Sequence, residues 1–184
     1  MWVTPTFVAG EMMAVLPGGK LPSDSLQHYL PAMLREAMVS ALVPPGMPAN
    51  AGVLGMALYQ KRFEVVRGLH RAGVPILAGT DAPLPNSIPG FGLHDELANL
   101  VKAGLTPRQA LAAATSEPGL YFATDTLGAI RRGAVADLVV LDASPLENIR
   151  NTKRIWMVVA GGRLFSADEL KSLRVAALKA AAKT

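Results

Sequence analysis

The chain has 184 residues, 51% of them hydrophobic, with a formal net charge of +4 and no cysteine, and we expect a globular, cytoplasmic protein with a sizeable core. The lack of cysteine excludes disulfides, zinc–thiolate sites, iron–sulfur clusters and a cysteine nucleophile, and the lack of a long apolar run excludes a membrane partner. The basic residues are scattered toward the far end without interleaved aromatic residues, which favours a solvated surface over a nucleic-acid partner.

Short strands and helices are expected to alternate through the first half of the chain. Residues 2–8, WVTPTFV, predict a strand in which Pro5 marks an edge, a bulge or an end. Ser23 is suited to cap a helix over residues 24–40, whose apolar residues recur at helical spacing and which Pro31 could kink.

A second helix and a buried strand come next. Residues 54–72 carry a broad apolar stripe, and Gly73 fits the left-handed position that follows a helix end. Residues 74–79, VPILAG, are apolar at every position, without period-two alternation, which is typical of a parallel strand covered on both faces. The order of helix, glycine and buried strand is half of a repeating β/α unit.

Capping signals define the helices that follow. Residues 93–102 predict a helix that ends at Gly104. Thr106 then serves as the N-cap of another helix, and Gln109 completes its capping box.

The character of the sequence changes near Ala123. Residues 127–142 and 155–165 predict short strands joined by glycine turns, and therefore a β-rich appendage. Ser166 and Glu169 form the capping box of a terminal helix. The apolar face expected for this helix consists of Leu170, Leu173, Ala177 and Leu178.

Asp81 directly follows the apolar strand. In barrels of parallel strands the catalytic groups stand at the C-terminal ends of the strands, which is the place of Asp81. Its carboxylate suits a metal ligand or a general base, and it equally suits a cap of the next turn through Thr80 or nearby backbone amides. The local pattern leaves both interpretations open.

His94 and Glu96 begin the helix that follows the Asp81 loop, where they would face the same mouth. We predict His94 as a catalytic residue, a metal ligand or a substrate contact, and Glu96 as a substrate contact. The alternatives are a structural histidine and, for Asp95 and Glu96, acidic side chains that favour a helix N-terminus on dipole grounds alone.

Four blocks of the sequence follow one another in a specific order: GVPILAGTDAPLP from residue 73, LHDELANLVKAGLTPRQALAAAT from 93, LGAIRRGAVADLVVLDASPLENIRNTKRI from 127 and VVAGGRL from 158. They resemble the C-terminal part of the amidohydrolase superfamily, in its imidazolonepropionase-like and prolidase-like branch. The resemblance implies an α/β chain, a partial metal-dependent (β/α)8 barrel that holds the last two or three β/α units over residues 1–123. A small β-sandwich appendage over 124–165 and a C-terminal helix over 166–184 would follow.

The resemblance also implies a chemistry. Asp81 matches the aspartate after the last barrel strand, which binds metal and takes a proton from the attacking water. The implied activity is metal-assisted hydrolysis of an amide, ester, lactone or phosphoester bond in a small-molecule substrate, with zinc, manganese or iron as the divalent metal. Asp81 and His94 are the expected metal ligands.

The sequence departs from the family in its ligand set. Such proteins begin with a His-x-His pair, a metal-bridging lysine or its equivalent and two further histidines, whereas this chain has only His28, His70 and His94. We therefore expect a truncated chain without the N-terminal metal-binding half. A catalytically inactive remnant, acting only as a folded or self-assembling module, is the alternative. Open strand edges lead us to expect a homo-oligomer in either case.

Overall fold

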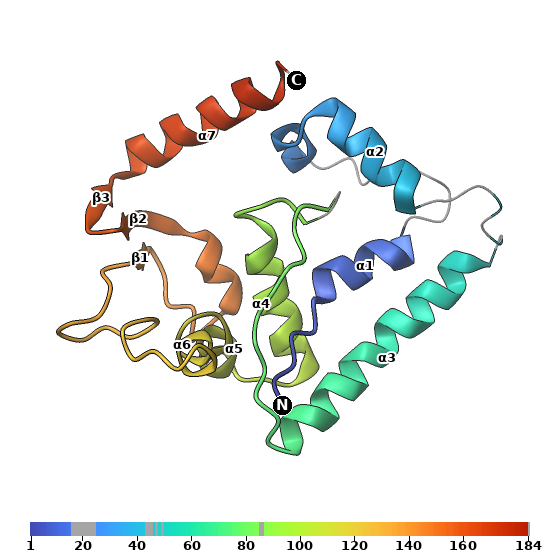
Figure 1. The fold of residues 1–184 in the computed structure, drawn as a ribbon, viewed down its shortest axis with the longest axis horizontal. Helices are drawn as coiled ribbons and strands as arrows, with labels where there is room; N and C mark the ends of the chain where they lie inside the picture. Colours follow the sequence, from blue (N-terminus) through green and yellow to red (C-terminus); the bar gives the residue numbers. More distant parts are fainter. Residues whose placement is uncertain (16–24, 43–45, 47, 49, 85–86, 184) are drawn as a thin grey trace.

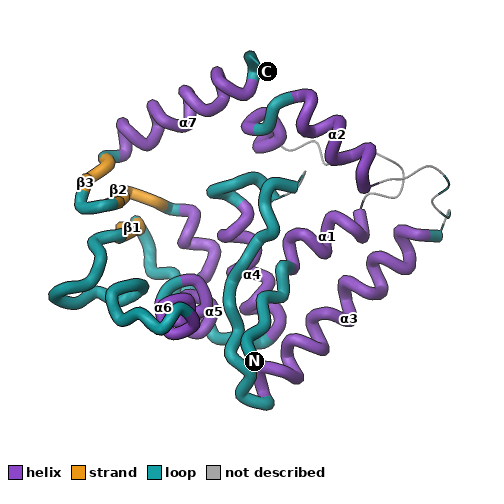
Figure 2. The backbone as a smooth tube through the Cα atoms, viewed as in Figure 1, coloured by secondary structure: helices purple, strands orange, loops and turns teal. Residues whose placement is uncertain are grey.

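The computed structural model describes residues 1–15, 25–42, 46, 48, 50–84 and 87–183. Helices dominate the larger part of the fold, and a small sheet and a terminal helix lie toward the C-terminus (Figure 1). Figure 2 shows how much of the remaining chain is extended or looped between these elements.

Two extended segments run parallel at the centre of the N-terminal part. Val3 and Ile76 form a parallel bridge. The Val3 backbone N–H donates to the carbonyl of Pro75 at 3.1 Å, and the Leu77 N–H donates to the carbonyl of Val3 at 2.9 Å. The segment predicted as a buried strand is therefore extended and parallel to the first residues of the chain, although the pairing is confined to one bridge.

The strand predicted over residues 2–8 is wrong in its second half. Helix α1 (Phe7–Val15) begins there instead, directly after Thr6, whose φ of +46° turns the chain. The reason is tertiary, because the amide of Val8 at the start of this helix is bound by the side chain of Glu96, far away in the sequence.

The predicted helix over 24–40 is divided. A 3-10 helix, η1 (Ser25–Tyr29), precedes α2 (Ala32–Leu42), and Pro31 lies at the break, as its missing N–H leads one to expect. Ser23, the predicted cap, and residue 24 lie outside the described residues.

Two predicted helix ends are confirmed. Helix α3 (Ala51–Arg71) ends before Gly73, which has φ +76°, and α4 (Gly92–Ala103) ends at Gly104, which has φ +116°. The capping box of Thr106 begins α5 (Pro107–Ala114) as predicted. A short helix that was not predicted, α6 (Ser116–Tyr121), follows it.

The core lies where α1, α3 and α4 meet beneath the parallel segments. The rings of Phe7 and Phe63 are stacked with their centroids 4.4 Å apart. Burial of such apolar side chains supplies most of the stabilisation of the fold. The buried cluster comprises Phe7, Tyr59, Phe63, Val66, Ile76, Leu97, Leu100, Ala103, Leu105, Ala110, Ala113 and Ile149.

The C-terminal part contains an antiparallel three-stranded sheet in the order β1 (Leu138–Leu141), β2 (Ile155–Ala160) and β3 (Arg163–Phe165). A 3-10 helix, η2 (Ile149–Lys153), precedes β2. The described residues form this single sheet and not the two layers of the expected sandwich, and no residue of its three strands is buried.

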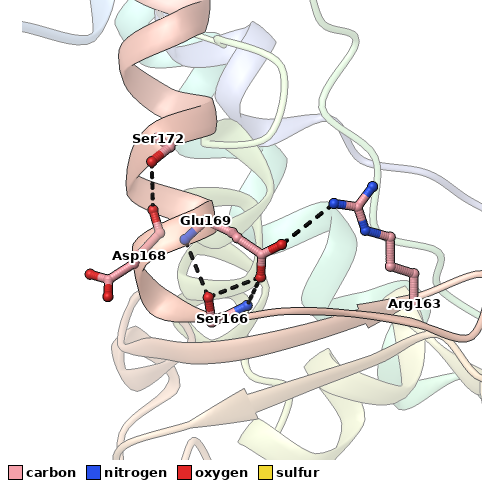
Figure 3. Close-up of polar contacts among 5 residues, drawn as sticks. All are labelled: Arg163, Ser166, Asp168, Glu169 and Ser172. Carbon is pink, nitrogen blue, oxygen red and sulfur yellow. Dashed lines mark hydrogen bonds and ion pairs between the residues drawn. The ribbon is translucent and has the colours of Figure 1, made fainter.

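The terminal helix α7 (Ala167–Ala181) begins with the predicted capping box (Figure 3). Ser166 Oγ accepts from the backbone N–H of Glu169, whose carboxylate accepts from the N–H of Ser166 at 2.8 Å and from Arg163 at 3.4 Å. The face predicted to be apolar is incompletely covered, since Leu173 is 53% exposed. In the described part of the chain, no helix has both the length and the apolar character needed to cross a membrane.

Candidate functional site

Asp81 ends the second extended segment and is exposed. Its backbone has φ +55°, a conformation that non-glycine residues seldom adopt. The hydroxyl of Thr80, and not the carboxylate of Asp81, accepts the backbone N–H of Ala82, at 3.3 Å. Among the described residues none hydrogen-bonds to or pairs with the Asp81 carboxylate.

The backbone just before Asp81 is held by the loop that follows. Ser87 is fully buried, and its hydroxyl donates to the carbonyl of Thr80 at 3.1 Å. Gly92 lies against Ser87 so closely that a Cβ at that position would meet Ser87 Oγ at 2.8 Å. The start of α4 and the base of the Asp81 turn are thereby packed together.

His94 lies in the first turn of α4 and is partly buried. Burial lowers its pKa below the ordinary value, and the positive charges of Lys153 and Arg174 lower the pKa further, against the opposing effect of Asp95. Its Nδ1 is buried without a hydrogen-bond partner among the described residues. These neighbours belong to α4, η2 and α7, so His94 lies beside the C-terminal elements.

The contact between α4 and η2 explains this neighbourhood. Lys153 Nζ and Asp95 Oδ1 are 2.6 Å apart and join the end of η2 to the first turn of α4. Nothing in the sequence signalled this pair, because the two residues are separated by 58 positions.

Glu96 is fully buried and has a structural role. Its Oε2 accepts the backbone N–H of Val8 at 3.0 Å, and hydrogen bonding to the backbone of Phe7 and Val8 favours the charged form. Desolvation is the larger effect and raises the pKa of Glu96 to about 7. The side chain therefore caps the N-terminus of α1 from another helix, while its Oε1 has no partner among the described residues.

The residues present do not fit a complete metal site. Across the described ranges, no three His, Cys, Asp or Glu side chains lie close enough together to hold a metal ion. His28 is exposed on η1 and His70 stands near the end of α3, while Glu96 is engaged with α1. Of the two acidic residues predicted for the site, Asp81 has the exposed carboxylate and Glu96 the buried one. The catalytic and ligand roles of Asp81 and His94 stay predictions.

The chain is similar to known proteins in family, sequence and fold. The model of the amidohydrolase family matches residues 22–165. An imidazolonepropionase of Haloarcula marismortui is 34% identical over 144 residues, which cover 74% of this chain and 33% of that protein. An ochratoxinase of Aspergillus niger is 34% identical over 115 residues, which cover 59% of this chain and 23% of that protein.

Solved structures show the same relationship. A bottromycin amidohydrolase superimposes with a TM-score of 0.75 at 25% identity and covers 98% of this chain and 40% of its own. The A. niger ochratoxinase superimposes with a TM-score of 0.56 at 29% identity, covering 73% of this chain and 31% of its own. The chain thus spans about a quarter to a third of the length of the curated relatives that it matches.

Proposed function

The chain belongs to the amidohydrolase family, and from this premise we propose that it carries the aspartate-bearing end of a hydrolytic site. The bond cleaved is an amide, ester, lactone or phosphoester bond in a small molecule, and Asp81 is the general base. The observation that supports this assignment is the exposed Asp81 carboxylate, which no described neighbour engages, on a turn anchored by Ser87.

The proposed step uses Asp81 as a proton carrier. The oxygen of water forms the new bond to the carbonyl carbon or phosphorus, while Asp81 accepts one of the water protons. The scissile bond then breaks, and the leaving amine or alcohol takes up that proton. His94 would contact the substrate or the leaving group from the start of α4.

Family members typically use a divalent metal, which would supply Lewis-acid activation of the water. This chain offers Asp81 and, by prediction, His94 as donors, and zinc, manganese or iron would need further donors than the described residues bring together.

We also propose the place of the chain within the fold of its family. The parallel bridge between Val3 and Ile76, with α3 before the second segment and α4 after it, supports the last β/α units of a (β/α)8 barrel over residues 1–123. Residues 124–165 would then be the β-rich appendage and 166–184 the terminal helix.

A second candidate function is a folded module without catalysis. It is favoured by the position of Glu96, which caps α1, and by that of His94, whose charged neighbours all belong to α4, η2 and α7. In this case Asp81 would be a free surface carboxylate.

Asp81→Asn distinguishes the two candidates because it keeps the shape of the side chain and removes its basicity. Hydrolysis of p-nitrophenyl esters and N-acyl amino acids should fall roughly 100- to 10,000-fold, with an unchanged melting temperature, if Asp81 is the base. Asp142→Asn is the matched control, since Asp142 is also exposed but lies after β1. Equal hydrolysis by wild type and Asp81→Asn would exclude the catalytic assignment.

Metal analysis of protein purified without chelator provides an independent measurement. Stoichiometric zinc, manganese or iron that is lost on Asp81→Asn would support a metal-assisted site. Metal content that is equally low in both proteins, together with absent hydrolysis, would favour the non-catalytic module.

A further inference from the structure

The first residues of the chain and the segment that ends at Asp81 share one face that is turned away from the core. The two segments are extended and lie side by side (Figure 2), with Val3 opposite Ile76. Successive residues of an extended segment point to opposite sides. Ile76 belongs to the buried cluster, and Val3 and Ala78 pack against it. Thr4, which follows Val3, therefore points away from the core.

Gly79 identifies the neighbours on this second side. A Cβ at Gly79 would lie 2.5 Å from Cγ2 of Thr4 and 3.9 Å from Cγ2 of Thr6. Both threonine methyl groups thus lie over Gly79, and that of Thr4 leaves no room there for a side chain. Thr4, Thr6 and Gly79 form one surface, the threonine face, which brings the first segment against the end of the second.

The hydroxyl groups of the threonine face have no partner in the part of the chain that the structure describes. Thr4 is exposed and Thr6 is partly buried. Thr6 has φ +46° and Asp81 has φ +55°, so both segments turn at the same end. Because Asp81 is two residues beyond Gly79, their Cα atoms are at most about 7 Å apart. One small molecule is therefore long enough to contact the threonine face and Asp81 together.

We propose that Thr4 and Thr6 bind the uncharged amide or carboxylic ester group of the substrate on which Asp81 acts, an inference that rests on the proposed function. A hydroxyl group both donates and accepts hydrogen bonds, as the N–H and C=O of an amide require. A phosphoester is negatively charged and would be repelled by the Asp81 carboxylate. Residues 1–19 and 72–101, which include both segments, contain no Lys or Arg to offset that charge. The substrate class is therefore an amide or ester, lactones included, and not a phosphoester.

Equilibrium dialysis with p-nitroacetophenone tests the binding apart from the hydrolysis, because this ketone keeps an uncharged carbonyl group and cannot be hydrolysed. Wild type should bind it, and Thr4→Val and Thr6→Val should each raise the dissociation constant about 3- to 10-fold through the loss of one hydrogen bond. Thr4→Ser and Thr6→Ser keep the hydroxyl group and should bind like wild type. Thr115→Val is the matched control, since Thr115 is exposed and lies at the end of α5. Circular dichroism would show that each variant folds.

Hydrolysis of p-nitrophenyl acetate separates the role of the threonines from that of Asp81. Thr6→Val should raise KM by the same factor as the dissociation constant of the ketone and leave kcat within about threefold, because the lost contact is equally strong in the ground state and the transition state. Asp81→Asn should lower kcat instead. Loss of ketone binding in Thr6→Val, together with no hydrolysis by wild type, would reject the hydrolytic function and still support the threonine contacts.

Three results would overturn the proposal. The first is a wild type that does not bind p-nitroacetophenone at about 10 mM. The second is equal binding of this ketone by wild type, Thr4→Val and Thr6→Val. The third is binding of p-nitrobenzylphosphonate, an anionic probe of similar size, as tight as that of the ketone, whereas the proposal expects it to be at least about 10-fold weaker.

Discussion

The buried carboxyl of Glu96 makes the stability of the protein depend on pH in an unusual direction. Burial raises its pKa from 4.5 to about 7 in the folded protein. The folded state therefore holds a proton that the unfolded state releases, so the contribution of Glu96 to stability is fully present below about pH 4.5 and is lost as the pH rises through about 7.

The size of this effect follows from the shift. Each pKa unit corresponds to 1.36 kcal/mol, so the raised pKa amounts to about 3 kcal/mol of unfolding free energy between low and neutral pH. His94 acts in the opposite direction, because its lowered pKa makes stability fall as the pH drops below its ordinary value of 6.5. The difference between wild type and a Glu96 variant isolates the contribution of Glu96.

Glu96→Gln is the suitable change, because the amide oxygen can still accept the N–H of Val8 while the side chain no longer titrates. Urea unfolding at pH 5, 6, 7 and 8 should show the free energy of unfolding of the variant rising by about 2.5 kcal/mol relative to that of wild type across this range. Glu147→Gln, at an exposed position, should show no such trend. A difference between wild type and Glu96→Gln that stays constant from pH 5 to 8 would refute the reasoning.

Three further predictions concern the packing and the helix ends. Phe63→Ala should destabilise the protein by about 3 to 5 kcal/mol in urea unfolding because it removes a ring stacked on Phe7 in the core; a loss below about 1 kcal/mol would contradict that packing. Thr106→Ala should lower the stability measured by thermal unfolding by about 1 kcal/mol, because it removes the capping box. Thr106→Ser keeps a capping hydroxyl and should retain the stability of wild type. Lys153→Met should lower the free energy of unfolding by less than about 1 kcal/mol, because the ion pair of Lys153 with Asp95 is half exposed. This decrease should vanish in 1 M salt, and a decrease that persists there would mean that packing dominates.

The sequence by itself determined the features that depend on a few neighbouring residues. The capping box of Thr106, the glycine after α4 and the break at Pro31 all appear where the sequence predicts them. Each is decided by a side chain or a backbone preference within about four positions, and such short-range effects act in the same way in many folds.

The features that only the tertiary structure decided all depend on contacts between distant residues. The start of α1 at Phe7, in place of a longer strand, accompanies the hydrogen bond from Val8 to Glu96, which are 88 positions apart. The same contact makes Glu96 a buried cap, although its place in the sequence suggested a substrate contact. The neighbours of His94 are set by the packing of α4 against η2. Local periodicity carries no information about these pairs, because the free energy of burying a carboxylate depends on which distant amide reaches it.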